Sequence, residues 1–354
     1  MRVRFEKRLE TSKLLRITAP FVAVMFSLFT AGIIMFFADI NPIDAYKDMF
    51  IEALGTSYGI SETLVKATPL IICGLGISIA FRMQLWNIGA EGQLVMGAIG
   101  ASYVALFSGI ENHFLMISLM ILASMLFGGL WAFVSGFLKA KYRVNEIIVT
   151  LLMNYIAISI LSFLIYGKWK DPEGFNFPHS SQFVEAARLS YYFDSRLHTG
   201  FFIALILVFL IYFFMEKTVY GYEIRVIGDN PNAAKYAGMN INSAVMGTMF
   251  LSGAIVGIAG FSEVAGVQYR LQESVSIGYG YTSIIVAWLA RRSAIGVLVV
   301  SLIMGVLLVG GDSLQIIWQL PVAFINLFQG LILFFVLSSD FFIANKIKII
   351  WGKS

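Results

Sequence analysis

Long apolar runs separated by short polar segments extend over nearly the whole chain. A helix needs about 20 apolar residues to cross the hydrocarbon core of a bilayer. The runs predict about ten membrane-spanning helices, near residues 14–38, 63–81, 94–107, 114–138, 147–167, 200–215, 244–267, 282–290, 294–311 and 322–337. The pattern therefore predicts an all-α polytopic membrane protein with a single transmembrane domain over residues 1–354.

Composition supports this interpretation. Hydrophobic residues make up 58% of the 354 residues, charged residues only 13%, and the mean hydropathy is +0.81. A soluble domain has about a quarter charged residues, so too few are present here to cover a water-soluble surface. The single cysteine, Cys73, permits no disulfide within the chain, and three scattered histidines form no metal pattern. We therefore predict neither a metal site nor a cofactor.

The basic residues predict how the chain is oriented. With the N-terminus inside, 18 of the 25 Lys and Arg residues fall on the cytoplasmic side and 7 on the other. Cytoplasmic loops of membrane proteins are enriched in Lys and Arg. We therefore expect the protein to lie in the cell's inner membrane with both termini in the cytoplasm. This orientation places residues 216–243 inside and the polar loop 168–199 outside. The net charge of +4 then reflects topology and does not indicate nucleic-acid binding.

The segment between the second and third runs is interrupted by glycine and polar residues. Gly89 and Gly92 break helical continuity, and Asn87, Glu91 and Gln93 add polar groups. Irregular backbone at membrane depth is tolerated only inside protein or along a wet cavity. We therefore place these three polar residues near a solute pathway. The alternative is a tight cytoplasmic turn with Glu91 in solvent or near a helix N-terminus.

A second interrupted segment, residues 272–281, lies between the seventh and eighth runs. Its Ser-Ile-Gly-Tyr-Gly echoes Asn-Ile-Gly-Ala-Glu-Gly of the first, which predicts two inverted five-helix halves with a central site. Tyr279 joins the predicted pathway residues on this basis. The alternative is two unrelated glycine turns. Glu263, late in the seventh run, lines the pathway or only bonds a neighbouring helix, and the sequence does not decide between these.

The cytoplasmic segment contains a short, well-delimited helix. Asp229 or Asn230 can cap its N-terminus, Pro231 suits the first position, and Gly238 suits the residue after its end. A helix over residues 231–237 is too short to be stable alone in water. It is therefore predicted to dock against another protein, the alternative being packing against the membrane surface or its own loops.

Several catalytic signatures are absent from the sequence. It contains no Gly-x-x-x-x-Gly-Lys-[Ser/Thr] P-loop, no His-Glu-x-x-His and no Gly-x-Ser-x-Gly. The chain is therefore predicted not to be an enzyme, with any ATP hydrolysis occurring in another subunit.

The segment Trp86–Gln93, Trp-Asn-Ile-Gly-Ala-Glu-Gly-Gln, resembles the signature of permeases from bacterial nucleoside ABC importers, within the ribose and branched-chain amino acid permease superfamily. Gly228–Gly238 is similar to the family's cytoplasmic coupling loop. Gly278–Thr282, Val309–Gln315 and Gln329–Leu333 also fit, whereas Ala-Arg-Arg at 290–292 replaces the Gly-Arg often found there. The resemblance implies the ten-span type II ABC importer fold.

The resemblance also implies function and partners. It implies nucleoside translocation across the bacterial inner membrane, driven by cytoplasmic ABC ATPase subunits and supplied by an extracytoplasmic solute-binding lipoprotein. It suggests a heterodimer with a second, related permease. The implied ATPase-coupling residues are Asn230, Pro231, Ala233, Ala234 and Gly238. Ribose-type sugars remain an alternative cargo. An ion-driven secondary transporter and a structural membrane scaffold are alternative functions.

Overall fold

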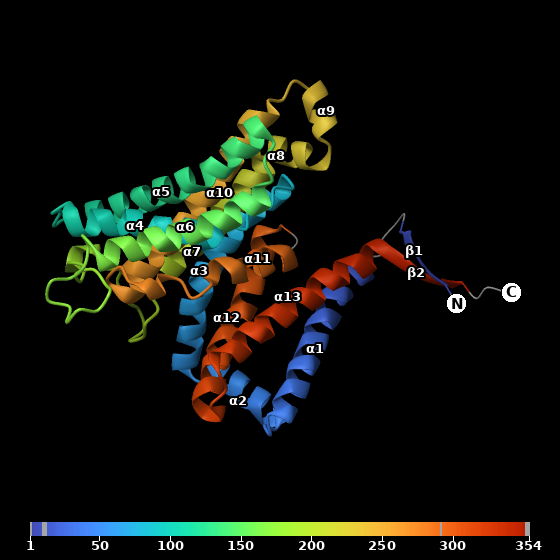
Figure 1. Ribbon diagram of the computed structural model, residues 1–354, viewed down its shortest axis with the longest axis horizontal. Helices are drawn as coiled ribbons and strands as arrows, with labels where there is room; N and C mark the ends of the chain where they lie inside the picture. Colours follow the sequence, from blue (N-terminus) through green and yellow to red (C-terminus); the bar gives the residue numbers. More distant parts are fainter. Residues whose placement is uncertain (1, 9–12, 291, 351–354) are drawn as a thin grey trace. The chain divides into compact units, whose positions relative to one another are not determined.

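The computed structural model describes residues 2–8, 13–290 and 292–350, and in this part of the chain the protein is mostly helical (Figure 1). The helices are α1 (Lys13–Phe37), α2 (Pro42–Leu54), α3 (Ser57–Arg82), α4 (Ala90–Phe107), α5 (His113–Tyr142), α6 (Glu146–Tyr166), α7 (Thr199–Lys217), α8 (Val219–Asp229), α9 (Pro231–Tyr236), α10 (Ile241–Glu263), α11 (Tyr279–Leu289), α12 (Ala294–Trp318) and α13 (Val322–Ala344). Two strands, β1 (Arg2–Lys7) and β2 (Asn345–Ile350), pair antiparallel.

Each of the ten predicted runs forms a helix, but not every one is a full span. Eight helices within the described residues are long and apolar enough to cross a membrane. A ninth candidate is the pair Val22–Phe37 and Pro42–Leu54, which is bent by 118°. The predicted span at 282–290 is α11, whose 11 residues extend only about 16 Å at 1.5 Å per residue. It is thus too short to cross the membrane by itself.

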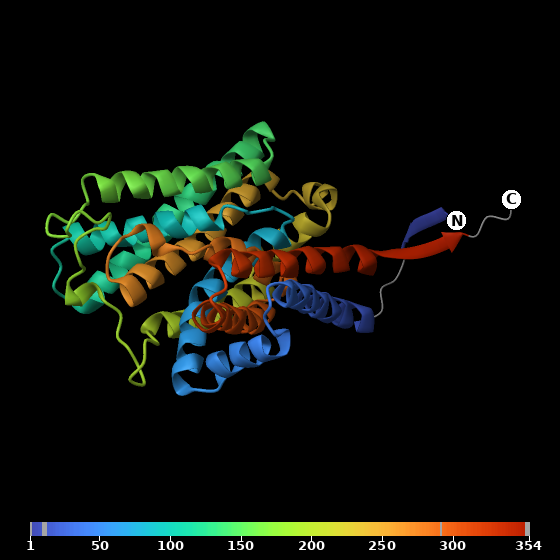
Figure 2. The same ribbon diagram turned by 60° about the horizontal axis from the view of Figure 1, so that its bottom comes forward.

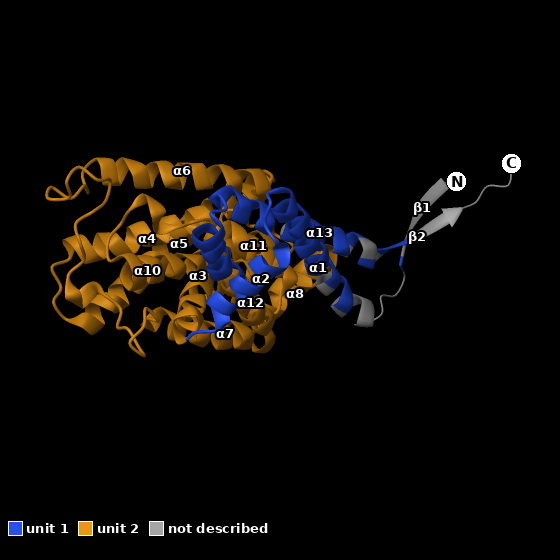
Figure 3. Cartoon of the chain, turned by 90° about the horizontal axis from the view of Figure 1, so that it is seen from below, with its two compact units in different colours: residues 1–56, 307–354 blue, residues 57–306 orange. Residues whose placement is uncertain are grey.

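The chain divides into two compact units (Figure 3). Residues 57–306 form the larger unit, in which α3, α4, α5 and α10 contact one another and α6 lies against α4 (Figures 1 and 2). The smaller unit contains residues 1–56 and 307–354. Within it, the Trp318 indole N–H donates to Asp48 at 3.1 Å, and the rings of Phe26 and Phe335 stack at 6.1 Å.

Glycines allow the helices of the larger unit to touch through their backbones. A Cβ added at Gly97 of α4 would overlap the backbone of Gly257 in α10. A Cβ at Gly128 of α5 would lie 2.9 Å from the Cα atom of the same Gly257. Lipid provides no hydrophobic driving force for helix association, so membrane helices depend on close packing. Small residues at their crossings allow the backbones to approach closely. Gly257 therefore lies where three helices meet.

The outer loop, predicted at 168–199, lies between α6 and α7 and is hydrogen-bonded to the segment that follows α10. It is irregular except for a 3₁₀ turn at Glu185–Ala187. Backbone N–H groups of Ser180, Phe183 and Leu189 donate to carbonyls of Leu271, Tyr269 and Ala265, at 2.8 Å in each case. The loop is therefore attached along the end of α10 and the segment that follows it.

The segment predicted at 216–243 contains two helices, where the sequence indicated one. The unpredicted helix is α8, which buries Gly221, Ile224, Ile227 and Gly228 on one side and carries Glu223, Arg225 and Asp229 together with the exposed Val219 and Tyr222 elsewhere. Helix α9 matches the predicted position, ending at Tyr236 with Ala237 as its C-terminal cap. The average polarity of this segment does not reveal an amphipathic helix, which is expected where one face of a helix packs on protein.

We expect Gly257→Leu to destabilise the purified protein by more than the about 1–3 kcal/mol typical of overpacked cores, because it would force backbones apart. A thermal unfolding midpoint measured in detergent would show the loss. Gly330→Leu in α13 is the control, since a Cβ there has no neighbour within 4 Å. An unchanged midpoint for Gly257→Leu would contradict the packing.

Candidate functional site

The two interrupted segments meet inside the larger unit. A Cβ added at Gly280, in the first turn of α11, would overlap the backbone nitrogen of Glu91, in the first turn of α4. Asn87 bonds to Ser252, near the middle of α10, and this places the junction at the depth of a spanning helix. Glu91 is only 4% exposed, which excludes a turn with Glu91 in solvent, but it does lie at helix N-termini, as the other form of that alternative stated.

Glu91 supplies the N-terminal cap of α11. Its two carboxylate oxygens accept hydrogen bonds from the backbone N–H groups of Gly278 at 3.2 Å and Gly280 at 2.8 Å. The N-cap residue of α11, Gly278, has φ +92° and no side chain that could do this. The free N–H groups at a helix start need acceptors, and they carry partial positive charge. The Glu91 carboxylate of α4 therefore accepts the hydrogen bonds that the start of α11 would otherwise lack.

Asn87 and Gln93 close the first interruption. The Asn87 amide donates to Gln93 at 3.0 Å and to Ser252 at 2.9 Å. Its oxygen accepts from the Gln93 amide at 2.8 Å and from the Gly89 N–H at 3.1 Å. Asn87 thus uses both donors and both lone pairs of its side chain. Its side chain therefore holds the backbone of the interrupted segment in this conformation.

Two further polar residues, both on α6, belong to the junction and were not predicted. The Asn154 oxygen accepts from the Gly92 N–H at 2.8 Å, and its amide donates to the Ile88 carbonyl at 2.9 Å. The Thr150 hydroxyl accepts from the Ile88 N–H at 3.3 Å. Both side chains satisfy backbone groups that the broken helix leaves unpaired. Their spacing of four residues on one face of an apolar run was the signal available in the sequence.

The remaining candidates are also buried. Tyr279 is the first residue of α11 and is 6% exposed, directly beside the capping contact. Glu263 is 4% exposed and ends α10, immediately before a π-helical turn at Val264–Gln268. The structure therefore brings Asn87, Glu91, Gln93 and Tyr279 into one buried junction. Their role as pathway residues stays a prediction.

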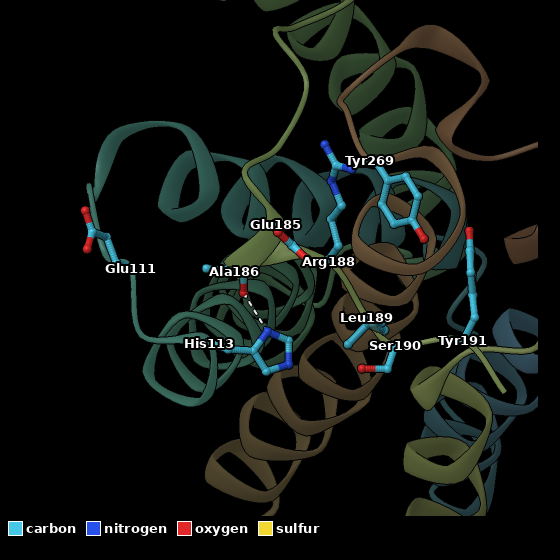
Figure 4. Close-up of a pocket in the computed structure, with 9 residues that line it drawn as sticks. All are labelled: Glu111, His113, Glu185, Ala186, Arg188, Leu189, Ser190, Tyr191 and Tyr269. Atoms are coloured by element: carbon cyan, nitrogen blue, oxygen red, sulfur yellow. Dashed lines mark hydrogen bonds between the residues drawn. The ribbon is translucent and has the colours of Figure 1, made fainter.

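The outer loop borders a cavity of about 920 Å³ (Figure 4). The side chain of Arg188 lies over the Tyr269 ring, 5.1 Å from its centroid, and also donates to the Phe183 carbonyl at 2.7 and 2.9 Å. His113 contacts the Ala186 carbonyl at 2.9 Å. The lining residues are Glu111, His113, Glu185, Ala186, Arg188, Leu189, Ser190, Tyr191 and Tyr269. The cavity thus combines aromatic surface with charges of both signs.

Helix α9 has the predicted caps. The Asn230 side chain accepts from the N–H groups of Asn232 and Ala233, both at 3.1 Å, and Pro231 opens the helix. Gly238 has φ +79°, and the Met239 N–H closes the C-terminal motif on the Ala234 carbonyl at 3.0 Å. Ala234 is buried, whereas Tyr236 is 94% exposed. The helix is thus well defined at both ends and presents most of its surface.

Comparison with known proteins gives one family and several relatives. The family described as branched-chain amino acid transport system / permease component matches residues 59–337. A glucose ABC transporter permease protein of Haloferax volcanii is 35% identical, over 94% of this chain and 90% of its own length. A guanosine ABC transporter permease protein of Bacillus subtilis is 33% identical, over 95% and 98%. A nucleoside ABC transporter permease protein of Lactococcus lactis is 31% identical, over 86% of each. No solved structure gives a significant match.

We expect Glu91→Ala to lower the stability of the purified protein, because it leaves the start of α11 without its acceptors. A hydrogen bond to a charged group contributes about 1.5–3 kcal/mol. Glu91→Gln keeps one acceptor oxygen and should lose less. Thermal unfolding in detergent measures both changes, with the exposed Glu173→Ala as control. Equal stability of Glu91→Ala and wild type would refute the capping role.

Proposed function

The chain belongs to the family of permease components of branched-chain amino acid transport systems, and on this premise we propose that it imports nucleosides as the membrane subunit of an ABC transporter. The observation that carries the proposal is α9, a capped and exposed helix on the side predicted to be cytoplasmic. The sequence contains no P-loop, so the proposal assigns ATP hydrolysis to a separate subunit.

Helix α9 acts as the coupling element in this proposal. Six residues cannot maintain a helix in water alone, and the caps at Asn230 and Gly238 hold it ready for a partner. The exposed Tyr236 ring offers a contact of the type that anchors protein interfaces. Because α9 and α8 contact each other and α8 contacts α3 and α10, a push on α9 reaches the membrane helices.

The cargo assignment rests on the relatives and on the first interrupted segment. Two of the three relatives above are named for guanosine or nucleoside transport, and one is named for glucose. The Trp86–Gln93 signature favours nucleosides. A ribose-type or other simple sugar is the alternative, since the receptor outside the membrane selects the solute in such systems.

The partners in the proposal are two ATPase subunits inside, a second related permease and a solute-binding lipoprotein outside. The lipoprotein would dock on the loop at 168–199 and the cavity beside it, where Arg188 and Tyr269 are already ordered against each other. Both termini are proposed to be cytoplasmic. The pairing of β1 with β2 supports placing both termini on one side of the membrane, and the distribution of Lys and Arg favours the cytoplasm as that side.

The junction at Glu91 is the proposed gate, and Asn87, Gln93 and Tyr279 are the proposed pathway residues. All of them are buried and the side-chain amide of Asn87 has all its hydrogen-bond partners, which supports the proposal that this conformation is closed to solute at the junction. Opening would exchange these hydrogen bonds for bonds to solute or water. Weak, exchangeable contacts suit a pathway in which release matters more than affinity.

A secondary transporter driven by protons or sodium is the rival function. It predicts that this chain alone, in vesicles with an ion gradient, accumulates solute without nucleotide. We expect no accumulation there.

We expect Gly238→Trp combined with Ala234→Asp to abolish co-purification of the ATPase subunits and solute-stimulated ATP hydrolysis, while the protein stays in the membrane. Tyr236→Ala, at an exposed position, should weaken both without affecting the fold. Gly109→Trp is the matched control, because Gly109 also has positive φ and a Cβ added there, as at Gly238, has no neighbour within 4 Å. Retained coupling in the double variant would rule out docking through α9.

We expect cells that express the complete transporter to accumulate labelled guanosine, with competition by unlabelled nucleosides and little competition by ribose. Deletion of this chain should remove the uptake. Uptake that ribose or glucose blocks as well as guanosine does would replace the nucleoside assignment with the sugar alternative.

A further inference from the structure

A second cavity, of about 260 Å³, lies where α3 and α11 end. It is lined by Phe81, Gln84, Trp86, Trp288 and Arg292. Phe81 is in the last turn of α3, Trp288 is in the last turn of α11, and the others lie in the connections that follow these helices. All five residues belong to the larger unit. The cavity therefore lies beside the first interrupted segment and at the end of α11 opposite the second one, on the side predicted to face the cytoplasm.

Three aromatic side chains form one wall of this cavity. The ring centroids of Trp86 and Trp288 are 4.9 Å apart, with planes inclined by 30°. Phe81 packs against both, at 5.3 Å from Trp86 and 5.8 Å from Trp288. Phe81 is buried, whereas both indoles are partly exposed. The buried phenyl ring thus supports two large aromatic side chains that retain accessible surface.

The two polar lining residues occupy unusual backbone positions. Gln84 has φ +58° and Arg292 has φ +65°. Each follows the end of a helix, at the left-handed position that normally favours glycine. The Leu85 N–H closes the end of α3 on the Ala80 carbonyl at 3.0 Å, which is the motif that usually carries this glycine. A long polar side chain at each site is locally unfavourable, and such outliers gather where a ligand is held.

We propose that this cavity is a binding subsite for a planar aromatic ring with hydrogen-bonding edges, such as the purine base of a nucleoside on its way to the cytoplasm. The inference rests on the proposed nucleoside cargo. Aromatic side chains stack on any base, and Gln84 and Arg292 provide hydrogen-bond donors at the rim. Ligand cavities usually measure about 300–1,000 Å³, so this smaller one suits one base-sized ring.

The shape and chemistry of the cavity favour a base over a lipid. An acyl chain would gain nothing from the amide of Gln84 or the guanidinium of Arg292. A lipid phosphate would use Arg292 but leave the indole faces without a role. The backbone carbonyl of Arg292 already accepts from the Arg82 side chain at 2.8 Å, which fixes this turn independently of the Arg292 side chain.

The subsite is next to the proposed gate in the chain. Trp86 immediately precedes Asn87, whose amide holds the first interruption closed. A ring that stacks on Trp86 would therefore engage the same connection that must move when the gate opens. Stacking gives modest affinity that tolerates different bases, which suits a site that must release its cargo.

The test measures binding of labelled guanosine to the purified transporter in lipid nanodiscs of phosphatidylcholine, together with guanosine uptake in cells. Trp288→Leu and Arg292→Gly are the variants, and Phe133→Leu, which stacks on Phe137 within α5, is the control. We expect Trp288→Leu to weaken binding about tenfold, as removal of a stacking partner does. Guanine should compete with guanosine, and ribose should not.

Arg292→Gly separates a binding role from a structural one. Glycine relieves the left-handed backbone, so the unfolding temperature should stay equal or rise while guanosine affinity falls severalfold. A fall in both would assign Arg292 a structural role and overturn the proposal. Binding within twofold of wild type for both variants would overturn it too. So would an effect of Arg292→Gly that appears only in nanodiscs containing anionic phosphatidylglycerol, which would indicate a lipid headgroup site.

The two proposals fail in different ways. If wild-type cells do not accumulate guanosine but the purified transporter binds it, and Trp288→Leu weakens that binding, the cargo assignment is wrong and the subsite stands. If wild-type cells take up guanosine and both Trp288→Leu and Arg292→Gly bind and transport it as well as wild type, the nucleoside assignment stands and the proposed subsite is wrong.

Discussion

The larger unit depends on satisfying the backbone of helices that stop inside the membrane. Unpaired N–H and C=O groups are costly in hydrocarbon, so each interruption needs partners from elsewhere in the protein. Glu91 provides them for α11, while Asn154 and Thr150 provide them for the segment before α4. The contacts join regions up to 189 residues apart in sequence, so the bundle must assemble before the breaks become tolerable.

Much of the fold could be predicted from the sequence because its signals are local. Apolar run length locates the helices, and the caps of α9 are visible as Asn230, Pro231 and Gly238. Helix α11 was mistaken for a full span, since apolarity does not show that the chain descends to mid-depth before the helix begins. The strands at the two ends and helix α8 were missed for the opposite reason, because their segments have no long apolar run.

The candidate site was predicted only in part. Glycine and carboxylate within an apolar context located the residues at 87–93, and the echo at 276–280 located their partner. Asn154 could not be assigned, since a single amide in an apolar helix shows nothing about which broken backbone it will bond. The aromatic cavity was equally hidden, because Phe81, Trp86 and Trp288 become neighbours only when the ends of α3 and α11 come together.

The crossing at Gly257 limits how such a protein can move. Backbone touches backbone there on two sides, through Gly97 and Gly128, with no side chain between that could change rotamer and absorb a shift. We therefore expect helices α4, α5 and α10 to keep their positions relative to one another when the protein moves. A change of access is easier for the elements that surround this crossing, such as the short α11, whose first turn is joined to α4 by Glu91 and to α6 by the hydrogen bond between Tyr281 and Asn154.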